Sequence, residues 1–349
     1  MNWTLHPWQA FEQFEDRWQA LCEQRYFGHP LLDVRWVRNV LKHFADDTVK
    51  LAVADGPIEA MAIVSPAGRL SSQTFTPSQI PMAMLIADTD ELDASSLARL
   101  AATCRTELFA ALHFDDLYHP TLSTASAEIE RVPYATTMSM RIEGSFEAYW
   151  QARAKNLRGN VRRYFRFANE DDLPPHFAIL SSVDDVVRGL ARYGDIESRG
   201  WKAAEGTNIH IDNEQGHFYR DVLSDFAATG AARVFEMSFG DMLVGSFLVI
   251  QSGTVAVLLK TTYDEEYKKY APGRLLLHDV LKAYFEDQSI RDFEFYTKAN
   301  KVQLQWSTHS RPIDHVNVYR RRPVAHLHRA VRSVVERVRS RRSGNSKVK

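Results

Sequence analysis

The sequence predicts an α/β protein made of two halves with a similar order of elements, followed by a basic C-terminal helix. Helical and strand-like hydrophobic patterns alternate along the chain. The order of predicted helices and strands in the first half is an approximate version of the order in the second half. The length of 349 residues is enough for two domains at roughly 150 residues each. Residues 320–349 combine a helical apolar stripe with a strong positive charge.

The first half is predicted to run helix, helix, strand, strand, helix, strand, strand. Its elements are expected at residues 8–21, 31–44, 50–54, 58–64, 92–111, 112–118 and 134–142. The second half is predicted to run helix, strand, two helices, three strands, helix, strand, short helix and strand. Its elements are expected at residues 145–170, 177–180, 183–197, 216–229, 231–238, 242–251, 254–262, 273–285, 291–296, 302–306 and 313–319. These patterns place the domains at residues 1–144, 145–320 and 321–349.

The composition excludes several classes of protein. Hydrophobic residues make up 45% of the chain and charged residues 25%, so most of the chain has enough apolar material to fold. Two cysteines, Cys22 and Cys104, are too few for a disulfide framework or a four-ligand zinc site. The histidines show no metal-binding spacing, so no metal is expected. No apolar run approaches the ~18 residues that span a bilayer and no signal peptide is visible, so we expect a cytoplasmic protein.

The charge of the chain is distributed unevenly. The net charge is −1, from 43 basic and 44 acidic residues. Residues 320–349 hold eleven of the basic residues and one acid, so the body before them carries 32 basic against 43 acidic residues. An apolar stripe runs through this basic segment at helical spacing, formed by Val324, Leu327, Val331, Val334 and Val338. Such a helix packs on its own domain, contacts an anionic membrane surface or a protein complex, or binds nucleic acid.

A basic turn before a helix is the most informative motif in the chain. The strand at 254–262 leads into the loop 264–272, and the next helix begins at Gly273. The free N–H groups and the positive end of that helix favour a phosphate, and Lys268, Lys269 and Arg274 add positive charge. The alternative is that Pro272 occupies the first helical position after a loop of solvated lysines.

The order of these motifs resembles the GNAT acetyltransferase superfamily. The motifs are the three-strand meander, Tyr-Asp…Tyr…Tyr-Ala-Pro-Gly-x-Leu-Leu at 263–276, the helix after it, Asp292-Phe293 in a strand, and Lys301…Trp306. Within the superfamily, the chain is similar to the branch of CelD-like proteins of cellulose biosynthesis and FemAB-like peptidyltransferases. The basic segment 153–163 and Gly200-Trp201-Lys202 are also similar to that branch. The resemblance covers residues 145–320 best.

The resemblance implies two tandem GNAT-like acyltransferase halves, of which the C-terminal half binds the acyl-CoA, and a fold in which a mixed sheet splays open at its middle strands. It implies acetyl-CoA or another acyl-CoA as donor, with the pantetheine in the splay and the pyrophosphate on the basic loop. The residues that it assigns to the cofactor are Lys268, Lys269, Tyr270, Gly273, Arg274 and Leu275. The chain departs from the usual GNAT loop, because Leu275 stands where a small residue is usual. It also has Tyr296 where the branch often has glycine.

Acyl transfer needs a base for the acceptor, an oxyanion donor and a proton for the leaving thiolate. The candidate bases are Glu236, Asp264 and Glu294, and the candidate acids or positioning groups are Tyr263, Tyr296 and Lys301. Of these, Glu236, Tyr296 and Lys301 are our predicted catalytic residues. The alternatives are that Glu236 faces solvent from a half-buried strand and that the tyrosines pack at the rim of the core.

We therefore expect an acyl-CoA-dependent N- or O-acyltransferase. Its acceptor would be an amine or hydroxyl on a small molecule or saccharide, such as a polysaccharide or cell-envelope precursor. Two alternatives remain open. One is a FemAB-type transferase that uses aminoacyl-tRNA, for which the basic residues of 153–166 and the C-terminal arginines would hold phosphates. The other is an accessory protein that keeps the fold without catalysis.

Overall fold

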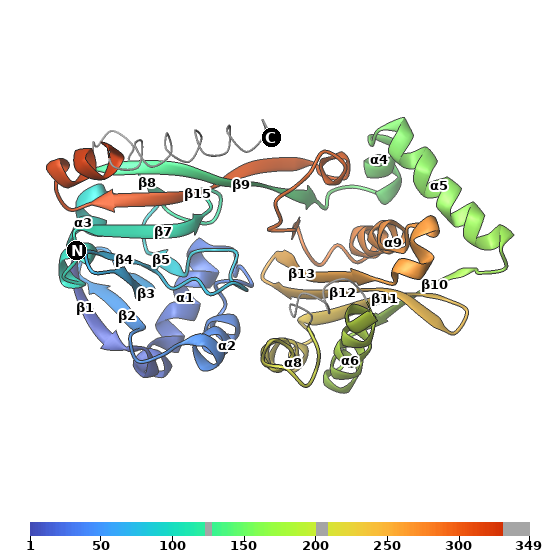
Figure 1. Ribbon diagram of the computed structural model, residues 1–349, viewed down its shortest axis with the longest axis horizontal. Coiled ribbons are helices and arrows are strands. Elements are labelled where there is room, and N and C mark those ends of the chain that lie inside the picture. The colour runs from blue at the N-terminus through green and yellow to red at the C-terminus, as the bar shows by residue number, and fades with distance from the viewer. Residues whose placement is uncertain (123–127, 200–208, 331–349) are drawn as a thin grey trace, which may run out of the picture. The chain divides into compact units, whose positions relative to one another are not determined.

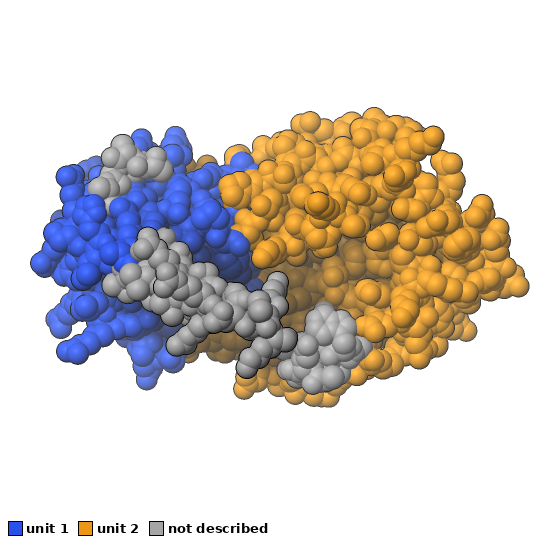
Figure 2. All heavy atoms as spheres, turned by 45° about the horizontal axis from the view of Figure 1, so that its top comes forward, with its two compact units in different colours: residues 1–13, 46–134, 313–349 blue, residues 14–45, 135–312 orange. Residues whose placement is uncertain are grey.

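The computed structural model describes residues 1–122, 128–199 and 209–330. The chain forms two compact units, which Figure 2 colours separately. Unit 1 contains residues 1–13, 46–134 and 313–349, and unit 2 contains residues 14–45 and 135–312. Both units are therefore assembled from segments far apart in the sequence. The domain boundaries 1–144, 145–320 and 321–349 stay a prediction.

Unit 1 is built on a sheet against which the helix at residues 94–103 packs. Its elements are β1 (Asn2–Pro7), β2 (Lys50–Asp55), β3 (Ala60–Gly68), β4 (Ser71–Thr74), β5 (Leu85–Ala87), β6 (Glu91–Leu92), α3 (Ala94–Thr103), β7 (Leu108–Phe114) and β8 (Thr121–Leu122). The strands β9 (Ile129–Arg141) and β15 (His309–Tyr319) contribute residues to both units. The strand order is β1-β2-β3-β4-β7-β15, with β5 paired to β3 (Figure 1). The β4–β7 pair is parallel.

A local capping interaction sets the start of helix α3, whereas tertiary pairing in the sheet sets its end. Asp93 caps its N-terminus and accepts a hydrogen bond of 2.6 Å from the Ser96 N–H. The predicted helix 92–111 is too long, because α3 ends at Thr103 and Arg105 has a φ of +58°. The next residues pair with β4 and β15 instead, so sheet pairing overrides the helical propensity of this alanine-rich stretch.

Unit 2 is a sheet with helices on both faces. Its elements begin with α1 (Glu15–Arg25), α2 (Val34–Phe44), α4 (Phe146–Gln151), α5 (Lys155–Glu170), β10 (Pro175–Leu180), α6 (Val183–Arg199) and α8 (Glu214–Ala227). They continue with β11 (Ala232–Phe239), β12 (Met242–Ser252), β13 (Val255–Tyr263), the 3-10 helix η2 (Glu265–Tyr270), α9 (Pro272–Asp287), β14 (Asp292–Glu294) and the 3-10 helix η3 (Gln303–Gln305). The strand order is β9-β14-β13-β12-β11-β10. Figure 1 shows α9 on one face of the sheet and α6 and α8 on the other.

The predicted α/β class with a mixed sheet is confirmed, and so is the division into two similar halves. Each unit contains a parallel strand pair with a helix between its two strands in the chain, β4–β7 around α3 and β13–β14 around α9. The predicted meander is present as β11, β12 and β13, joined at two tight turns. The predicted helix 145–170 is interrupted, because Ala154 has an extended ψ of 136° between α4 and α5.

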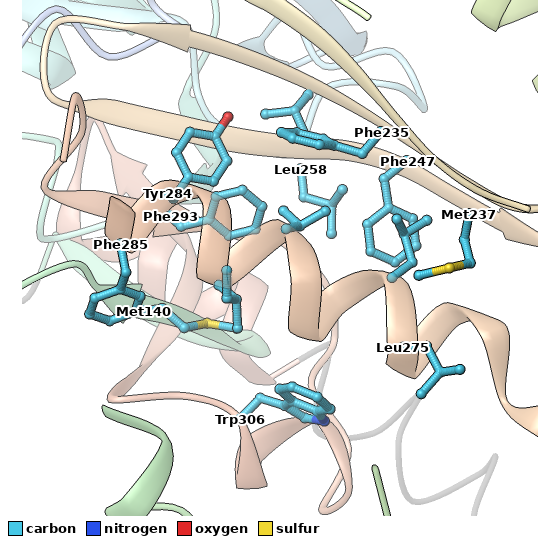
Figure 3. Packing of buried hydrophobic residues seen from close by; sticks show 14 of the residues in the cluster. Met140, Phe235, Met237, Phe247, Leu258, Leu275, Tyr284, Phe285, Phe293 and Trp306 are labelled. Carbon is cyan, nitrogen blue, oxygen red and sulfur yellow. The ribbon is translucent and has the colours of Figure 1, made fainter. Parts of the chain in front are cut away.

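The core of unit 2 lies between the sheet and α9. Phe235, Met237, Phe247 and Leu258 point from the strands toward this helix, as Figure 3 shows. Tyr284 reaches them from α9 and packs against Phe235 and Phe293, and Leu275 and Trp306 belong to the same cluster. Burying so many large apolar side chains fixes the position of α9 on the sheet, because each contributes roughly 1.5–3 kcal/mol when buried.

The sheet of unit 2 opens beside β13. Strands β13 and β14 pair only at residues 255–257 and 292–294, because β14 ends at Glu294 while β13 continues to Tyr263. The β12–β13 register also shifts at Leu248/Val249, and this bulge leaves Leu259 without an opposite residue. A bulge increases local twist and re-aims the strand. The opening is the kind of splay that the resemblance implies.

Candidate active site

A cavity of about 680 Å³ lies in unit 2 where the sheet opens. Its lining includes residues 258–263 of β13, residues 272–274 at the start of α9, residues 295–297 after β14, and Val302, Gln303 and Trp306. Its volume lies within the range of roughly 300–1,000 Å³ that is typical of small-molecule sites. The cavity therefore has room for a ligand that runs along β13.

One wall of this cavity is the edge of a β-strand. Beyond Val257, no described strand pairs with β13 on the side of β14. Backbone N–H and C=O groups at such an edge form hydrogen bonds with an extended ligand that carries amides. The edge thus offers to a ligand the interactions that a neighbouring strand would have made.

The N-terminus of α9 forms a basic end of the cavity. Ala271 has a left-handed φ of +51°, and this conformation turns the chain from η2 into the helix at Pro272. Lys268, Gly273 and Arg274 line the cavity at this point. A Cβ at Gly273 would meet its nearest atom, Cδ1 of Tyr263, at 3.8 Å, an ordinary contact distance. Packing therefore does not demand glycine here, whereas a side chain would take space from the cavity.

The other three residues predicted to hold the cofactor do not line the cavity. Lys269 and Tyr270 both donate to Oδ2 of Asp171, at 2.8 and 2.7 Å. These hydrogen bonds lower the pKa of Asp171 and raise the pKa of Lys269. Leu275 is completely buried in the core. The leucine at the usually small position of the loop therefore fills the core and leaves the cavity open.

Tyr296 is the one predicted catalytic residue that lines the cavity. Its hydroxyl lies 3.0 Å from Nε2 of His29. Its φ of +43° is one that glycine adopts easily and a bulky residue rarely does. Lys301 is exposed and precedes the lining residue Val302 without lining the cavity itself.

Glu236 lies on the other face of the sheet. Side chains alternate along β11, and its neighbours Phe235 and Met237 face α9. The Glu236 carboxylate is buried and accepts two hydrogen bonds from Arg192 of α6, each 2.9 Å long. The structure thus separates Glu236 from the cavity, and its catalytic role stays a prediction.

Of the remaining candidates, Tyr263 lines the cavity, whereas Asp264 and Glu294 do not. Tyr263 is 47% exposed. Asp264 caps η2 by accepting a hydrogen bond from the Glu266 N–H. Glu294 is fully buried and accepts a hydrogen bond of 3.0 Å from Arg311.

The sequence pattern did not indicate a functional role for two residues near the cavity. Tyr164 of α5 lines the cavity, and its hydroxyl accepts a hydrogen bond of 3.3 Å from Arg274. Its helical spacing marks it as a packing residue, which it also is. His29 precedes Tyr296 by 267 positions in the chain and lies in no motif, so spacing alone cannot connect them.

The described residues contain no group of three or more His, Cys, Asp or Glu side chains arranged to hold a metal ion. Within the same part of the chain, no helix has the length and apolarity needed to cross a membrane. Gly200-Trp201-Lys202 and residues 331–349 lie outside the described residues.

Comparison with known proteins gives a family match and structural relatives. Residues 155–303 match the family described as the acetyltransferase (GNAT) domain. No curated protein sequence matches the chain. One similar structure is the C-terminal domain of a protein described as a lysylphosphatidylglycerol synthetase from Agrobacterium fabrum. It has 11% identity and a TM-score of 0.57, over 93% of this chain and 97% of that one.

Two further structures resemble the chain over most of its length. FemX has 9% identity and a TM-score of 0.54, over 90% of this chain and 98% of its own. L-PGS from Bacillus licheniformis has 10% identity and a TM-score of 0.51, over 89% of this chain and 94% of its own. At these identities the likeness shows a shared fold.

Proposed function

We propose that the chain is an acyltransferase of the GNAT type, because residues 155–303 match the acetyltransferase (GNAT) domain, and that it transfers an acyl group from an acyl-CoA to an amine or hydroxyl. The observation that carries the proposal is that an unpaired strand edge and a basic helix N-terminus line the same cavity. The unpaired edge of β13 runs along it, and the basic N-terminus of α9 closes one end.

These two features suit the two chemical parts of an acyl-CoA substrate. The pantetheine arm carries amides, which pair with the backbone edge of β13. The pyrophosphate is an anion, which the N–H groups at the start of α9 bind with help from Lys268 and Arg274. Lys269, Tyr270 and Leu275 support this end by holding η2 and α9 in place. No metal takes part in this proposal.

The residues of the cavity also suit acyl transfer. Tyr296 lines the cavity and carries a hydroxyl, which in this proposal donates a proton to the leaving thiolate. Glu236 and Lys301 remain proposed members of the site, and their contribution is tested by substitution. FemX and the lysylphosphatidylglycerol synthetase share the fold, and the name of the latter refers to a membrane lipid. We therefore propose a small-molecule or saccharide acceptor of the cell envelope.

The test of this function is the thermal stability of the protein with acetyl-CoA, longer acyl-CoAs, free CoA and ATP. A ligand that binds only the folded state stabilises it by about 2.7 kcal/mol at a hundredfold excess over its Kd. We expect a rise in Tm with the CoA species, and the loss of that rise in Gly273→Glu. The absence of any rise with the folded protein would refute the proposed donor.

A second candidate function is supported by the basic face of α5. Lys155, Arg158, Arg162 and Arg163 line a second hollow of about 630 Å³ together with Asn156, Gly159 and Asn160. The opposite side of the helix is buried through Leu157, Val161 and Ala168, so its apolar face is already used. The basic face of α5 is therefore suited to bind the phosphates of a nucleic acid, as a FemAB-type transferase that uses aminoacyl-tRNA would require.

A matched pair of variants separates the two functions. A Cβ at Gly159 would meet no atom within 4 Å, so Gly159→Glu adds a carboxylate to α5 without a clash. We expect this variant to weaken the binding of tRNA and to leave the Tm rise with CoA unchanged. Gly273→Glu is expected to abolish the Tm rise with CoA and to leave the binding of tRNA unchanged. Binding of tRNA through α5 also falls steeply between 50 and 200 mM salt, by about tenfold or more. Salt-insensitive binding would exclude this second function.

The third possibility is an accessory protein that keeps the fold. In that case the basic residues 320–349 dock on an anionic membrane surface or a protein complex. Turnover of an acyl-CoA with a bound acceptor would exclude it. Co-sedimentation with vesicles of anionic lipid, compared between the full chain and one shortened at residue 330, measures the contribution of this segment separately.

A further inference from the structure

The backbone at Tyr296 is held in a conformation that its side chain disfavours. Its φ of +43° lies in the left-handed region, where the Cβ crowds the following carbonyl. Such conformations persist only where surrounding contacts determine them, and they gather at functional sites. Tyr296 has such contacts with two residues that do not themselves line the cavity: His29 at its hydroxyl, and the Arg311 guanidinium, which lies 5.7 Å from its ring centroid.

The imidazole of His29 is fixed in both position and tautomer. His29 is completely buried, and its Nδ1 accepts a hydrogen bond of 3.2 Å from the Leu31 N–H. Because Nδ1 accepts, the proton of the neutral ring lies on Nε2. Nε2 therefore donates to the Tyr296 hydroxyl oxygen at 3.0 Å, and the tyrosine proton is directed away from His29. The two rings meet edge to face, with centroids 5.6 Å apart.

The segment that carries His29 is anchored to the strands that form the cavity. A Cβ at Gly253, in the β12–β13 turn, would lie 1.8 Å from the Phe27 carbonyl oxygen, so the two backbones are in direct contact. Asp33 accepts a hydrogen bond of 3.0 Å from Ser252 in the same turn. The His29 carbonyl oxygen accepts from the N–H groups of Leu32 and Asp33. His29 is therefore fixed relative to β13.

We infer that His29 is a positioning residue that holds the Tyr296 hydroxyl at the cavity wall as the proton donor of the acyl transfer. This inference rests on the proposed function. When the acceptor nitrogen or oxygen bonds to the acyl carbon, the carbon–sulfur bond breaks and its electron pair goes to sulfur. The thiolate takes the Tyr296 proton, and the proton that the acceptor releases returns to the phenolate through solvent. His29 keeps its own proton throughout and fixes the direction of the transfer.

The kinetic test measures thiol release from the acyl-CoA that raises the Tm most, with hydroxylamine as the acceptor. His29→Phe keeps an aromatic ring and removes the donor, and we expect kcat to fall by about tenfold to a hundredfold while KM for the acyl-CoA changes less than about twofold. His29→Gln restores an N–H donor and recovers kcat to within about fivefold of wild type. The double variant His29→Phe/Tyr296→Phe is no slower than Tyr296→Phe alone, because His29 acts through Tyr296.

The matched control is His43→Gln, which changes a half-buried histidine that bonds Asp221 instead. It leaves kcat unchanged. Additive losses in the double variant, or equal losses in His29→Gln and His29→Phe, would overturn the inference. So would a Tyr296→Phe variant with wild-type kcat.

A second measurement tests the hydrogen bond between His29 and Tyr296 without relying on enzyme activity. In ¹⁵N NMR spectra, the signals absent from His29→Gln identify the imidazole of His29. We expect a protonated Nε2 and an unprotonated Nδ1, and a shift of Nε2 in Tyr296→Phe. If no acyl-CoA binds or reacts, the proposed function fails while these spectra still report the contact. A proton on Nδ1, or spectra unchanged by Tyr296→Phe, refute the positioning role itself.

Discussion

Arg192 holds the Glu236 carboxylate by two hydrogen bonds of 2.9 Å, on the face of the sheet opposite the cavity. Arg192 is 41% exposed at its side chain, whereas the Glu236 side chain is 9% exposed. The pair joins α6 to β11 in a bidentate geometry. A carboxylate held in this way contributes to the docking of the helix.

Glu236→Gln keeps the shape of the side chain and removes its charge. We expect the free energy of unfolding to fall by about 1 kcal/mol, because Arg192 loses its charged partner and the glutamine amide accepts only one of the two hydrogen bonds, while water screens the half-exposed arginine. If Glu236 serves only the docking of α6, turnover per folded molecule stays within about twofold of wild type. Chemical denaturation and thiol release measure the two effects. A hundredfold loss of turnover in a stable protein would instead establish Glu236 as the catalytic base.

Lys268→Ala and Lys269→Ala form a matched pair at neighbouring exposed positions. Lys268 lines the cavity, whereas Lys269 is paired with Asp171. We expect Lys268→Ala to weaken CoA binding by about fivefold to tenfold, which corresponds to about 1 kcal/mol. Lys269→Ala changes the affinity by less than about twofold. Isothermal titration with CoA measures both constants, and equal effects of the two variants would contradict a phosphate site at Lys268.

Gly253→Ala tests the anchoring of the segment that carries His29. Gly253 and Gly240 both occupy hairpin turns of the meander with positive φ, +52° and +57°. A Cβ at Gly253 would collide with the Phe27 carbonyl at 1.8 Å, whereas a Cβ at Gly240 would meet no atom within 4 Å.

Gly240→Ala therefore measures the cost of the backbone conformation alone, about 1 kcal/mol. We expect Gly253→Ala to cost at least about 3 kcal/mol, because the segment must also move. It additionally lowers kcat, since His29 shifts away from Tyr296. Equal Tm values for the two variants would show that the collision is relieved without cost.

The stability of unit 2 depends on pH through Asp221 of α8. Burial by itself raises its pKa, but the hydrogen bonds from Lys42 and His43 of α2 outweigh burial and lower the pKa to about 2. The folded value lies below the unfolded value of about 3.9, so Asp221 contributes stability above that pH and loses it as the pH falls toward 2.

Asp221→Asn is therefore expected to lower stability at pH 7 by about 1 kcal/mol, because solvent screens much of the pair, and to have no effect near pH 2. Urea denaturation of both proteins between pH 2 and pH 7 measures the difference. A difference that stays constant across this range would show that the charge of Asp221 is not its cause.

Much of the fold of unit 2 follows from local patterns. The meander, the helix after Pro272 and the helices around residues 183–197 and 216–229 lie within a few residues of their predicted positions. The errors occur where tertiary contacts compete with propensity. Residues 108–111 join a sheet although they follow an alanine-rich helix, and β1 forms at the N-terminus by pairing with β2.

Part of the candidate site could be predicted from the sequence. The basic turn before α9 carried its own signal, and three of its six predicted residues, Lys268, Gly273 and Arg274, line the cavity. The pattern Phe235-Glu236-Met237 indicates that Glu236 faces away from its neighbours. It does not say on which face a cavity will lie.

The sequence by itself determined the order of helices and strands and the position of the basic turn, because hydrophobic period and helix-start signals depend on neighbouring residues. Only the tertiary structure decided which of two adjacent lysines reaches the cavity, which face of the sheet holds Glu236, and that His29 meets Tyr296. These relations depend on strand register, on the bulge in β13 and on contacts between residues more than 200 positions apart. No local pattern in the chain encodes such contacts, because they arise when the elements pack.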